Sequence, residues 1–414
     1  MTRFPPGIRL DPVSNAARAY VGVAIAAGAV FAFGLGIRQS QPLFISAINS
    51  HTAVGYATIS LAFGIAQLMW GVAQPIAGAV ADRYGMRPVM IVGVLCIALA
   101  TALTPFATSA LGLILLIGIL APCGAGAMGP AMLLSAATRW IPEAKRSFAS
   151  GIVNAGGSFG QFTLVPFAQL LIGLAGWQPA MMLLGASGLL AIPLVLWLTR
   201  GASGAAPQAH TGAATLGEAI RGAAGDRSFV LLTVGFFTCG FHVAFIATHL
   251  PGIVATCELP ATVSAWSLAI IGLFNIAGSL WVGRAIQEWR MKLALAGIYA
   301  ARAVLIVIFF YSPKTEMTFF LFAAGIGFTY LSTVPPTMGL VAKLHGTRYL
   351  ATLFGIVMLS HQVGGFLGAW LGGKAFEGTG SYDWMWWADA ALCLVAAVVH
   401  LPIREARKLA SAAA

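Results

Sequence analysis

Charged side chains are scarce in this sequence: 8% of its 414 residues are Asp, Glu, Lys or Arg, whereas 59% are hydrophobic. Soluble domains carry about 25% charged residues. A chain so poor in charge cannot cover a water-facing surface of its own, so most of its surface must face lipid. The scarcity therefore excludes a soluble globular protein, although the length alone would suggest two or three soluble domains.

Signals of enzymes and of metal sites are also lacking. The five cysteines lie in or at the ends of hydrophobic segments without metal-ligand spacing: Cys96, Cys123, Cys239, Cys257 and Cys393. There is no nucleotide-binding motif and no Ser/His/Asp set, and no carboxylate accompanies the histidines of the hydrophobic segments. We therefore expect no enzyme, no metal site and no cofactor.

Hydrophobic stretches long enough to cross a ~30 Å hydrocarbon core, about 20 residues each, recur along the whole chain. Twelve are predicted, at residues 20–46, 53–80, 88–107, 110–138, 147–172, 178–199, 228–255, 262–284, 293–311, 317–341, 349–373 and 384–402. Within lipid only a helix pairs every backbone amide inside its own segment. An all-α membrane protein with 12 transmembrane helices is predicted. No cleavable signal peptide is expected, because residues 1–18 are polar and a full-length stretch follows directly.

Basic residues indicate the orientation in the membrane. Of the 23 Lys and Arg residues, all fall on the side of both termini except Lys314, Lys374, Arg38 and Arg302. The positive-inside rule then places both termini in the cytoplasm. We expect a multi-pass plasma membrane protein, in a bacterium the inner membrane, whose net charge of +11 reflects topology and contact with anionic lipids. Nucleic-acid binding is not expected, since the basic residues are scattered over short loops.

One long polar interruption divides six stretches from six. It begins with the Gly/Ala/Ser/Pro-rich segment Gly201–Pro207, which is typical of a linker. The prediction is an N-terminal six-helix bundle at 1–199, a cytoplasmic linker at 200–227 and a C-terminal six-helix bundle at 228–414. A short amphipathic surface helix is expected at 215–226.

The loop after the second stretch carries a specific motif. Residues 78–88 read Gly-Ala-Val-Ala-Asp-Arg-Tyr-Gly-Met-Arg-Pro, which resembles the major facilitator signature Gly-x-x-x-Asp-Arg-x-Gly-x-Arg-Pro. The resemblance implies two pseudo-symmetric bundles around a central path, and a gating role for Asp82, Arg83 and Arg87, whose charge cluster would close one end of the path. The alternative is a set of solvated charges that only fixes topology. A weaker second copy at 278–292 has Gln287 where the acid is expected.

Ionisable residues within membrane spans are costly and usually mark a pathway. Those predicted to lie inside spans are Arg38, His242, His249, Arg302 and His361, with Asp389 nearer the outer end of the last span. Two arginines that cannot lose their protons, with no acid near the midplane, favour an anionic substrate held by one Arg from each half. The alternatives are snorkelling of Arg38 to the outer interface and bonding of Arg302 to backbone carbonyls or to an Asn.

Neutral polar residues and histidines are predicted to line the cavity between the halves. Asn275, His242, His361 and Gln362 complete the predicted substrate site with the two arginines. A proton-coupled cycle would need a histidine as carrier, and His361 is the best placed, followed by His242. The alternative for each histidine is an imidazole that only bonds neighbouring helices.

Two segments resemble the monocarboxylate-porter branch of the major facilitator superfamily and its bacterial organic-acid transporters. Residues 139–156 match an aromatic, a basic pair, Ala-x-Gly and Ala-Gly at the start of span 5, and residues 33–40 match span 1 of the branch. The resemblance implies that Arg38 receives the substrate carboxylate. This sequence departs from the branch in lacking its acidic start of span 1 and its Asp/Arg pair in span 8.

These observations predict a secondary active transporter of small organic anions, with monocarboxylates favoured, that works as a monomer by alternating access. Proton symport, anion exchange and uniport are left open, as is the direction of transport. The alternatives are a multidrug or cation exporter of the same fold, which would be expected to carry a membrane Asp or Glu, and a membrane sensor that no longer transports.

Overall fold

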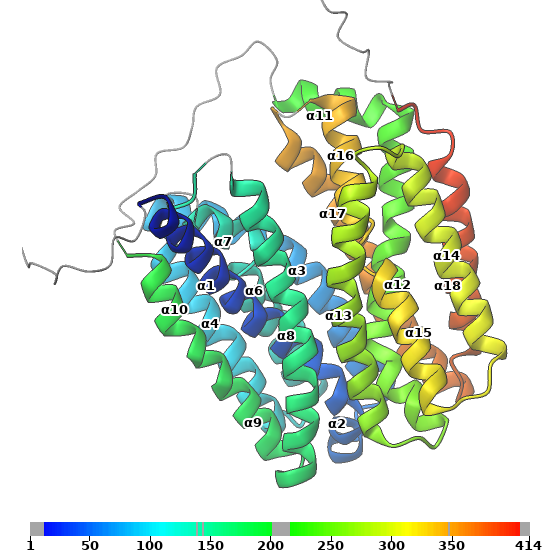
Figure 1. Ribbon diagram of the computed structural model, residues 1–414. Coiled ribbons are helices and arrows are strands. Elements are labelled where there is room, and N and C mark those ends of the chain that lie inside the picture. The colour runs from blue at the N-terminus through cyan, green and yellow to red at the C-terminus, as the bar shows by residue number, and fades with distance from the viewer. Residues whose placement is uncertain (1–11, 138–139, 143–144, 201–215, 347, 406–414) are drawn as a thin grey trace, which may run out of the picture.

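The computed structural model describes residues 12–137, 140–142, 145–200, 216–346 and 348–405. Part of the predicted linker, residues 201–215, lies outside the described residues, and so do positions 138–139 and 143–144, which include Arg139 of the segment 139–156. Every regular element of the described residues is a helix (Figure 1). The predicted all-α fold is confirmed.

The first half of the chain supplies the helices drawn from blue to green in Figure 1. They are α1 Pro12–Ser40, η1 Gln41–Phe44, α2 Ile45–Thr52, α3 Tyr56–Tyr84, α4 Met86–Leu103, η2 Thr104–Phe106, α5 Ala110–Leu113, η3 Ile114–Leu120, α6 Ala121–Ala127, α7 Pro130–Ala137, α8 Arg146–Ala175, α9 Trp177–Ser187, η5 Gly188–Leu190 and α10 Ala191–Leu198. Their buried apolar side chains form one core cluster, which takes only Ala244 and Ala369 from later in the chain.

The second half supplies the helices drawn from green to red. They are α11 Leu216–Gly225, α12 Arg227–Thr256, α13 Ala261–Ala285, α14 Met291–Tyr311, α15 Glu316–Thr329, α16 Val334–His345, α17 Leu350–Thr379 and α18 Asp383–His400. The short surface helix expected at 215–226 is α11. Figure 1 places α11 at one end of the molecule and α2 at the other, and these are called here the α11 end and the α2 end.

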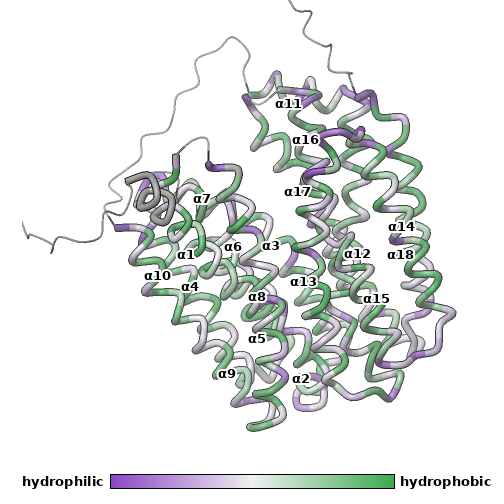
Figure 2. Tube along the Cα trace, in the orientation of Figure 1, coloured by the Kyte–Doolittle hydropathy of each residue, from purple (hydrophilic) through white to green (hydrophobic). Residues whose placement is uncertain are grey.

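Eleven stretches of the described residues have the length and hydropathy to cross a membrane. The twelfth expected span corresponds to α18, which is 18 residues long and buries the polar side chains of Asp389 and His400. Apolar residues dominate the helices along their length, and hydrophilic residues gather toward the loops at both ends (Figure 2). The sequence prediction of twelve spans therefore agrees with the fold. The least hydrophobic span is α18, which contains the two buried ionisable residues.

Prolines stand at the interruptions of the spans, although Pro75, Pro166 and Pro251 lie inside continuous helices. A proline cannot donate a backbone hydrogen bond and its ring displaces the preceding turn. Pro42 lies in the 3₁₀ turn that separates α1 from α2, and Pro122 follows the π-helical segment η3. Pro335 and Pro336 open α16, so the tenth span is broken between Thr329 and Val334. That break leaves carbonyl groups without helical donors in the middle of the protein.

The most extensive contacts between the two halves are those of α3 with α17 and of α8 with α13, and α12 also touches η1 and α3. Gly64, Gly71 and Gly78 recur every seventh residue, so they share one face of α3. A Cβ atom at Gly64 would lie 3.0 Å from the Phe366 carbonyl oxygen, and one at Gly71 would lie 2.7 Å from Cγ of Gln362. At Gly78 such an atom would meet nothing within 4 Å. The halves are therefore closed from the α2 end to the middle and apart at the α11 end.

Polar contacts hold the closed end together. Glu377 of α17 accepts a hydrogen bond from the Ala57 backbone N–H at 2.7 Å, and thereby satisfies an otherwise free donor in the first turn of α3. Next to it the rings of Tyr56 and Phe376 meet edge to face, with centroids 5.0 Å apart. A negative charge at a helix N-terminus is stabilising, so Glu377 acts as a lock between the halves in this conformation.

Candidate functional site

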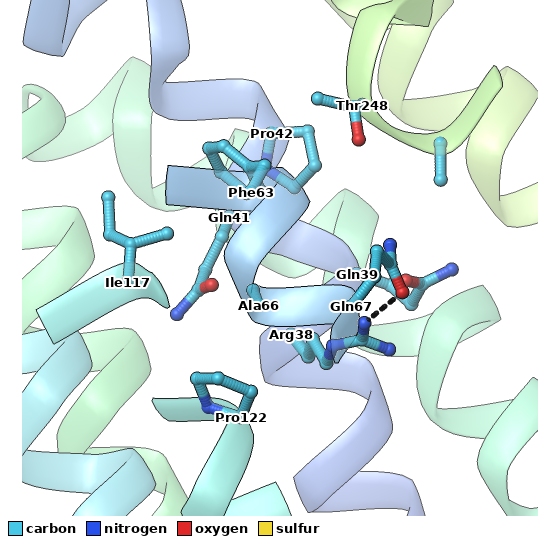
Figure 3. A pocket seen from close by; sticks show the side chains of 11 residues that line it. Arg38, Gln39, Gln41, Pro42, Phe63, Ala66, Gln67, Ile117, Pro122 and Thr248 are labelled. Atoms are coloured by element: carbon cyan, nitrogen blue, oxygen red, sulfur yellow. Dashed lines mark hydrogen bonds between the residues drawn. The ribbon is translucent and has the colours of Figure 1, made fainter. Parts of the chain in front are cut away.

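A narrow pocket lies between the halves where α1 passes into η1 (Figure 3). Its described lining residues are Arg38, Gln39, Gln41, Pro42, Phe63, Ala66, Gln67, Ile117, Pro122, Ala247 and Thr248. The first nine come from the first half of the chain, and Ala247 and Thr248 come from α12. Of these lining residues Arg38 alone carries a charge, so the pocket is electropositive.

Neutral groups position the guanidinium of Arg38. Its Nη2 donates to Oε1 of Gln67 at 2.5 Å, as the dashed line in Figure 3 shows, and its Cζ lies 4.8 Å from the ring centroid of Trp70. An aromatic face and an amide oxygen stabilise a cation without neutralising it. Arg38 is therefore oriented by α3 while its charge is free to attract an anion.

A polar chain continues from this pocket across the interface of the halves. Gln39 lies within hydrogen-bonding reach of the Tyr330 hydroxyl, and its Nε2 is 3.4 Å from Oε1 of Gln161. Gln161 in turn donates to the Leu268 carbonyl of α13 at 2.8 Å. The Tyr330 hydroxyl donates to the Val243 carbonyl at 3.0 Å. Tyr330 thus joins the break in the tenth span to the pocket.

Arg302 is completely buried behind that break, with 0% of its surface exposed. Its Nη2 donates to the carbonyl oxygens of Thr329 and Tyr330, which the end of α15 leaves free. Its Nε and Nη1 have no hydrogen-bond partner among the described residues. The structure therefore does not place Arg302 among the described residues that line the pocket of Arg38. Arg302 instead makes the contact named as its alternative, a bond to backbone carbonyls.

His242 has a carboxylate partner that the sequence analysis did not expect. Its Nδ1 lies 2.7 Å from Oδ2 of Asp389, and both side chains are fully buried. The premise that no acid accompanies a histidine inside the spans is therefore wrong. Position along the last span suggested that Asp389 sits toward the outside, but the packing of α18 against α12 brings it to the middle of α12. This acid also weakens the argument that nothing balances the two arginines.

The remaining predicted residues lie at the two contacts between the halves. Asn275 of α13 donates to the Ser158 hydroxyl of α8 at 2.8 Å and accepts from the Leu331 backbone N–H at 3.0 Å. His361 Nδ1 is 3.2 Å from Oε1 of Gln362, whose Nε2 is buried without a partner in the described structure. These residues border the path between the halves at the closest approach of the two helix pairs.

The predicted gating residues lie at the open end. Asp82, Arg83 and Arg87 are all exposed, and no ion pair of Asp82 is found among the described residues. In the second half, where the motif has Gln287, an acid from elsewhere is near. Glu405 pairs with Lys343 at 2.7 Å and accepts from the backbone N–H groups of Met291 and Lys292. Burial alone would raise the pKa of Glu405, but these bonds outweigh it and the pKa is lowered.

Sequence reasoning missed most contributors to the site, including Gln39 and Gln67 of the pocket, and three others are instructive. Trp70 lies in α3 at the α11 side of Gln67, and Tyr330 lies at the break before the paired prolines; nothing in their types marks them as pocket residues. Asp389 was noticed as a membrane acid but was placed too far out. Its partner could not be inferred, because α12 and α18 are far apart in sequence.

The family model described as Major Facilitator Superfamily matches residues 23–369. An uncharacterized MFS-type transporter of Bacillus subtilis (strain 168), YcxA, is 24% identical over 85% of this chain and 88% of its own length. Monocarboxylate transporter 13 of Rattus norvegicus is 28% identical over 77% of this chain and 73% of its own.

Among solved structures, the chain is similar to a bacterial homolog of the human lysosomal transporter Spinster in an inward-facing and occupied conformation. The TM-score is 0.72 with 15% sequence identity, and the match covers 92% of this chain and 96% of that one. At this identity the likeness concerns the fold.

Proposed function

The chain belongs to the Major Facilitator Superfamily, and we propose that it is a secondary active transporter of small organic anions, with monocarboxylates as the first candidates, that works by alternating access. It would act as a monomer in a plasma membrane, the inner membrane in a bacterium, with both termini in the cytoplasm. The α11 end then faces the cytoplasm, and the conformation described here is open inward.

The observation that carries the proposal is the charge of the pocket. Arg38 points into a space between the halves with no acidic side chain among its described lining residues. An arginine cannot escape the cost of this position by losing a proton, whereas a carboxylate can form two parallel, charge-assisted hydrogen bonds with it. A small anion is the ligand that satisfies this pocket, and the similarity to monocarboxylate transporters agrees with it.

The other predicted residues take supporting roles in this proposal. Asn275 at one contact between the halves, and His361 with Gln362 at the other, would border the substrate as the path opens and closes. His242 and Arg302 would act from within the second half, through Tyr330. Direct contact of Arg302 with the substrate would require its bonds to the Thr329 and Tyr330 carbonyls to exchange during the transport cycle.

The experiment that tests the proposal is a thermal-shift panel on the detergent-purified full chain. It compares short monocarboxylates, dicarboxylates, aromatic acids, sugars and lipophilic cations. A ligand at about 100 times its dissociation constant adds roughly 2.7 kcal/mol of stability, so one class of acid is expected to raise the melting temperature. Lys374→Gln is the matched control, because it removes an exposed positive charge that lies outside the pocket. It should keep the ligand response.

Stabilisation by lipophilic cations alone would contradict the proposal and favour the exporter alternative. A buried acid, Asp389, exists in this chain, and a cation exporter would be expected to have one. Asp389 is paired with His242 and does not line the pocket of Arg38, which is why the anion is preferred. Failure of any solute to bind would favour the sensor.

Opposite mutations at the two ends test alternating access. Glu377→Gln removes the charge that locks the α2 end, worth about 1 kcal/mol or roughly a fivefold change in population, so the α2 end should open more often. We propose that Asp82, Arg83 and Arg87 close the other end, so Asp82→Asn should favour the inward-open form. Distances between spin labels at exposed Ser50 and Met317 report on the α2 end. Equal distances in both variants and the wild type would refute these roles.

A further inference from the structure

The His242–Asp389 pair is a buried group that the proposed substrate site does not use. His242 Nδ1 and Asp389 Oδ2 share a hydrogen bond of 2.7 Å between α12 and α18, and the exposed fraction of both side chains is 0%. The other imidazole nitrogen, Nε2, is buried without a partner in the described structure. An ionised carboxylate at this depth is costly unless a positive charge or a proton accompanies it.

The surroundings of the pair contain one permanent charge. The titratable and charged groups that face the pair or its immediate neighbours are Cys393 on α18, Cys239 on α12, Arg302 and Tyr299 on α14, and His361 on α17. Cys393 Sγ is 3.9 Å from Asp389 Oδ1 and also lies within electrostatic range of Arg302. Asp389 and Arg302 are therefore both neighbours of Cys393, and their charges sum to zero when Asp389 is ionised and His242 is neutral.

The charges within the spans explain why a proton and an anion should bind together. With the buried thiols and histidines neutral and Asp389 ionised, Arg38 and Arg302 contribute +2 and Asp389 contributes −1, which leaves +1 in the empty protein. A proton alone would raise this sum to +2 in a medium of low dielectric constant, which is unfavourable. A monoanion beside Arg38 lowers the sum by one, so the protein loaded with both has the same +1 as the empty protein.

Tyr330 connects the pair to the pocket through the buried cluster. Its hydroxyl is bonded to the carbonyl of Val243, the residue after His242, and lies near Gln39 and Arg38. Its own carbonyl accepts from Arg302 at 2.6 Å. An anion that draws Arg38 and Gln39 therefore acts on Tyr330, and through the Tyr330 carbonyl on Arg302, which belongs to the same buried cluster as the pair. By linkage, a proton on the pair must favour the anion to the same degree.

We propose that His242 and Asp389 form the proton-binding site that couples anion transport to a proton gradient. This inference rests on the proposed function. His242 and Asp389 share one short hydrogen bond, so the proton is assigned to the pair and not to either residue alone. His361, whose described hydrogen-bond partner is Gln362, is not the carrier in this scheme, although position alone had favoured it.

Proteoliposomes containing the full chain, with the acid identified in the thermal-shift panel as probe, give the first readout. For one proton per anion, a gradient of one pH unit should drive about tenfold accumulation in the wild type. Asp389→Asn keeps the shape of the side chain and a hydrogen-bond acceptor for His242. In this variant the internal anion concentration should only become equal to the external one. Exchange of internal for external anion needs no proton release and should remain measurable.

His249→Gln is the matched control. His249 is another buried histidine of α12, but its Nε2 is bonded to the Ala369 carbonyl at 2.6 Å, and no ion pair of His249 is found among the described residues. Glutamine Nε2 can make the same bond, so this variant should keep the tenfold accumulation. Tenfold accumulation by Asp389→Asn, or its loss in His249→Gln as well, would overturn the proposal.

A second readout needs no substrate and so separates this inference from the proposed function. Infrared difference spectra between pH 5 and pH 8.5, with the proton as the only ligand, should contain a carboxyl band in the wild type that is absent in Asp389→Asn. His242→Asn keeps a donor to Asp389 without titrating, so its band should shift. If no acid is carried but the band behaves in this way, the proton site stands and the proposed substrate is wrong. Identical spectra in wild type and Asp389→Asn would refute the proton site. This outcome counts whether or not the variant transports the anion.

Discussion

Arg38→Gln is expected to abolish uptake of the organic anion while the protein still folds and inserts. The variant loses the charge of the pocket and two charge-assisted hydrogen bonds to a carboxylate, together about 3 kcal/mol or more, which corresponds to at least roughly a hundredfold loss in affinity. Folding should survive because Arg38 is only half-buried and its described hydrogen bond is a single one to Gln67. Uptake into proteoliposomes and the ligand-induced thermal shift measure the two effects separately.

Arg38→Lys sharpens this test. Lysine keeps the positive charge but is a point donor that cannot bind a carboxylate with two parallel bonds. It also loses the planar contact with Trp70. Partial uptake by Arg38→Lys with none by Arg38→Gln would identify the anion as the ligand of this residue. Normal uptake by Arg38→Gln would remove Arg38 from the substrate site.

Arg302→Met is expected to lower thermal stability strongly in the absence of any ligand. The carbonyls of Thr329 and Tyr330 would lose their buried donor, and the buried cluster around Cys393 would lose its permanent positive charge. Removing one member of a buried charged set costs about 3–5 kcal/mol. The measurement is the melting temperature of the purified, ligand-free variant, with Arg284→Met at the end of α13 as a control outside this cluster.

The contrary outcome is equally informative about Arg302. If the residue contacts the substrate rather than the broken helix, the ligand-free melting temperature should stay near that of the wild type and the ligand response should disappear. Arg302→Lys distinguishes the cases further, because a lysine can still donate to the two carbonyls. Recovery of stability by Arg302→Lys would support the structural role.

Much of the fold follows from hydropathy, because the length of each apolar stretch must match the hydrocarbon core. The predicted stretch at 228–255, for example, corresponds to α12 at Arg227–Thr256. The breaks inside the spans were not predicted, although Pro335 and Pro336 mark the break in the tenth span. A proline in a membrane helix is tolerated when neighbouring groups satisfy the freed carbonyls, and here that neighbour is Arg302, 27 residues away in sequence from Thr329.

The sequence marks the unusual residues of the candidate site but not how these residues are arranged. Rarity identified Arg38, Arg302 and His242, since a buried charge is conspicuous in an apolar segment. The side chains that contact these residues could not be predicted, because they depend on which helix faces pack together. His242 and Asp389 are separated by 147 residues, and the depth of Asp389 counted along α18 alone gave no hint of the pairing.

The row of glycines on α3 has a consequence for the energetics of the transport cycle. Gly71 packs on Gln362 near the middle of the contact, with Gly64 covered on one side of it and Gly78 uncovered on the other. A rocking motion about that point would uncover Gly64 and cover Gly78, exchanging one glycine contact for another. Glu377 at one end and Asp82 at the other supply comparable charges. A protein balanced in this way needs only a small difference in substrate affinity to pass between its two forms.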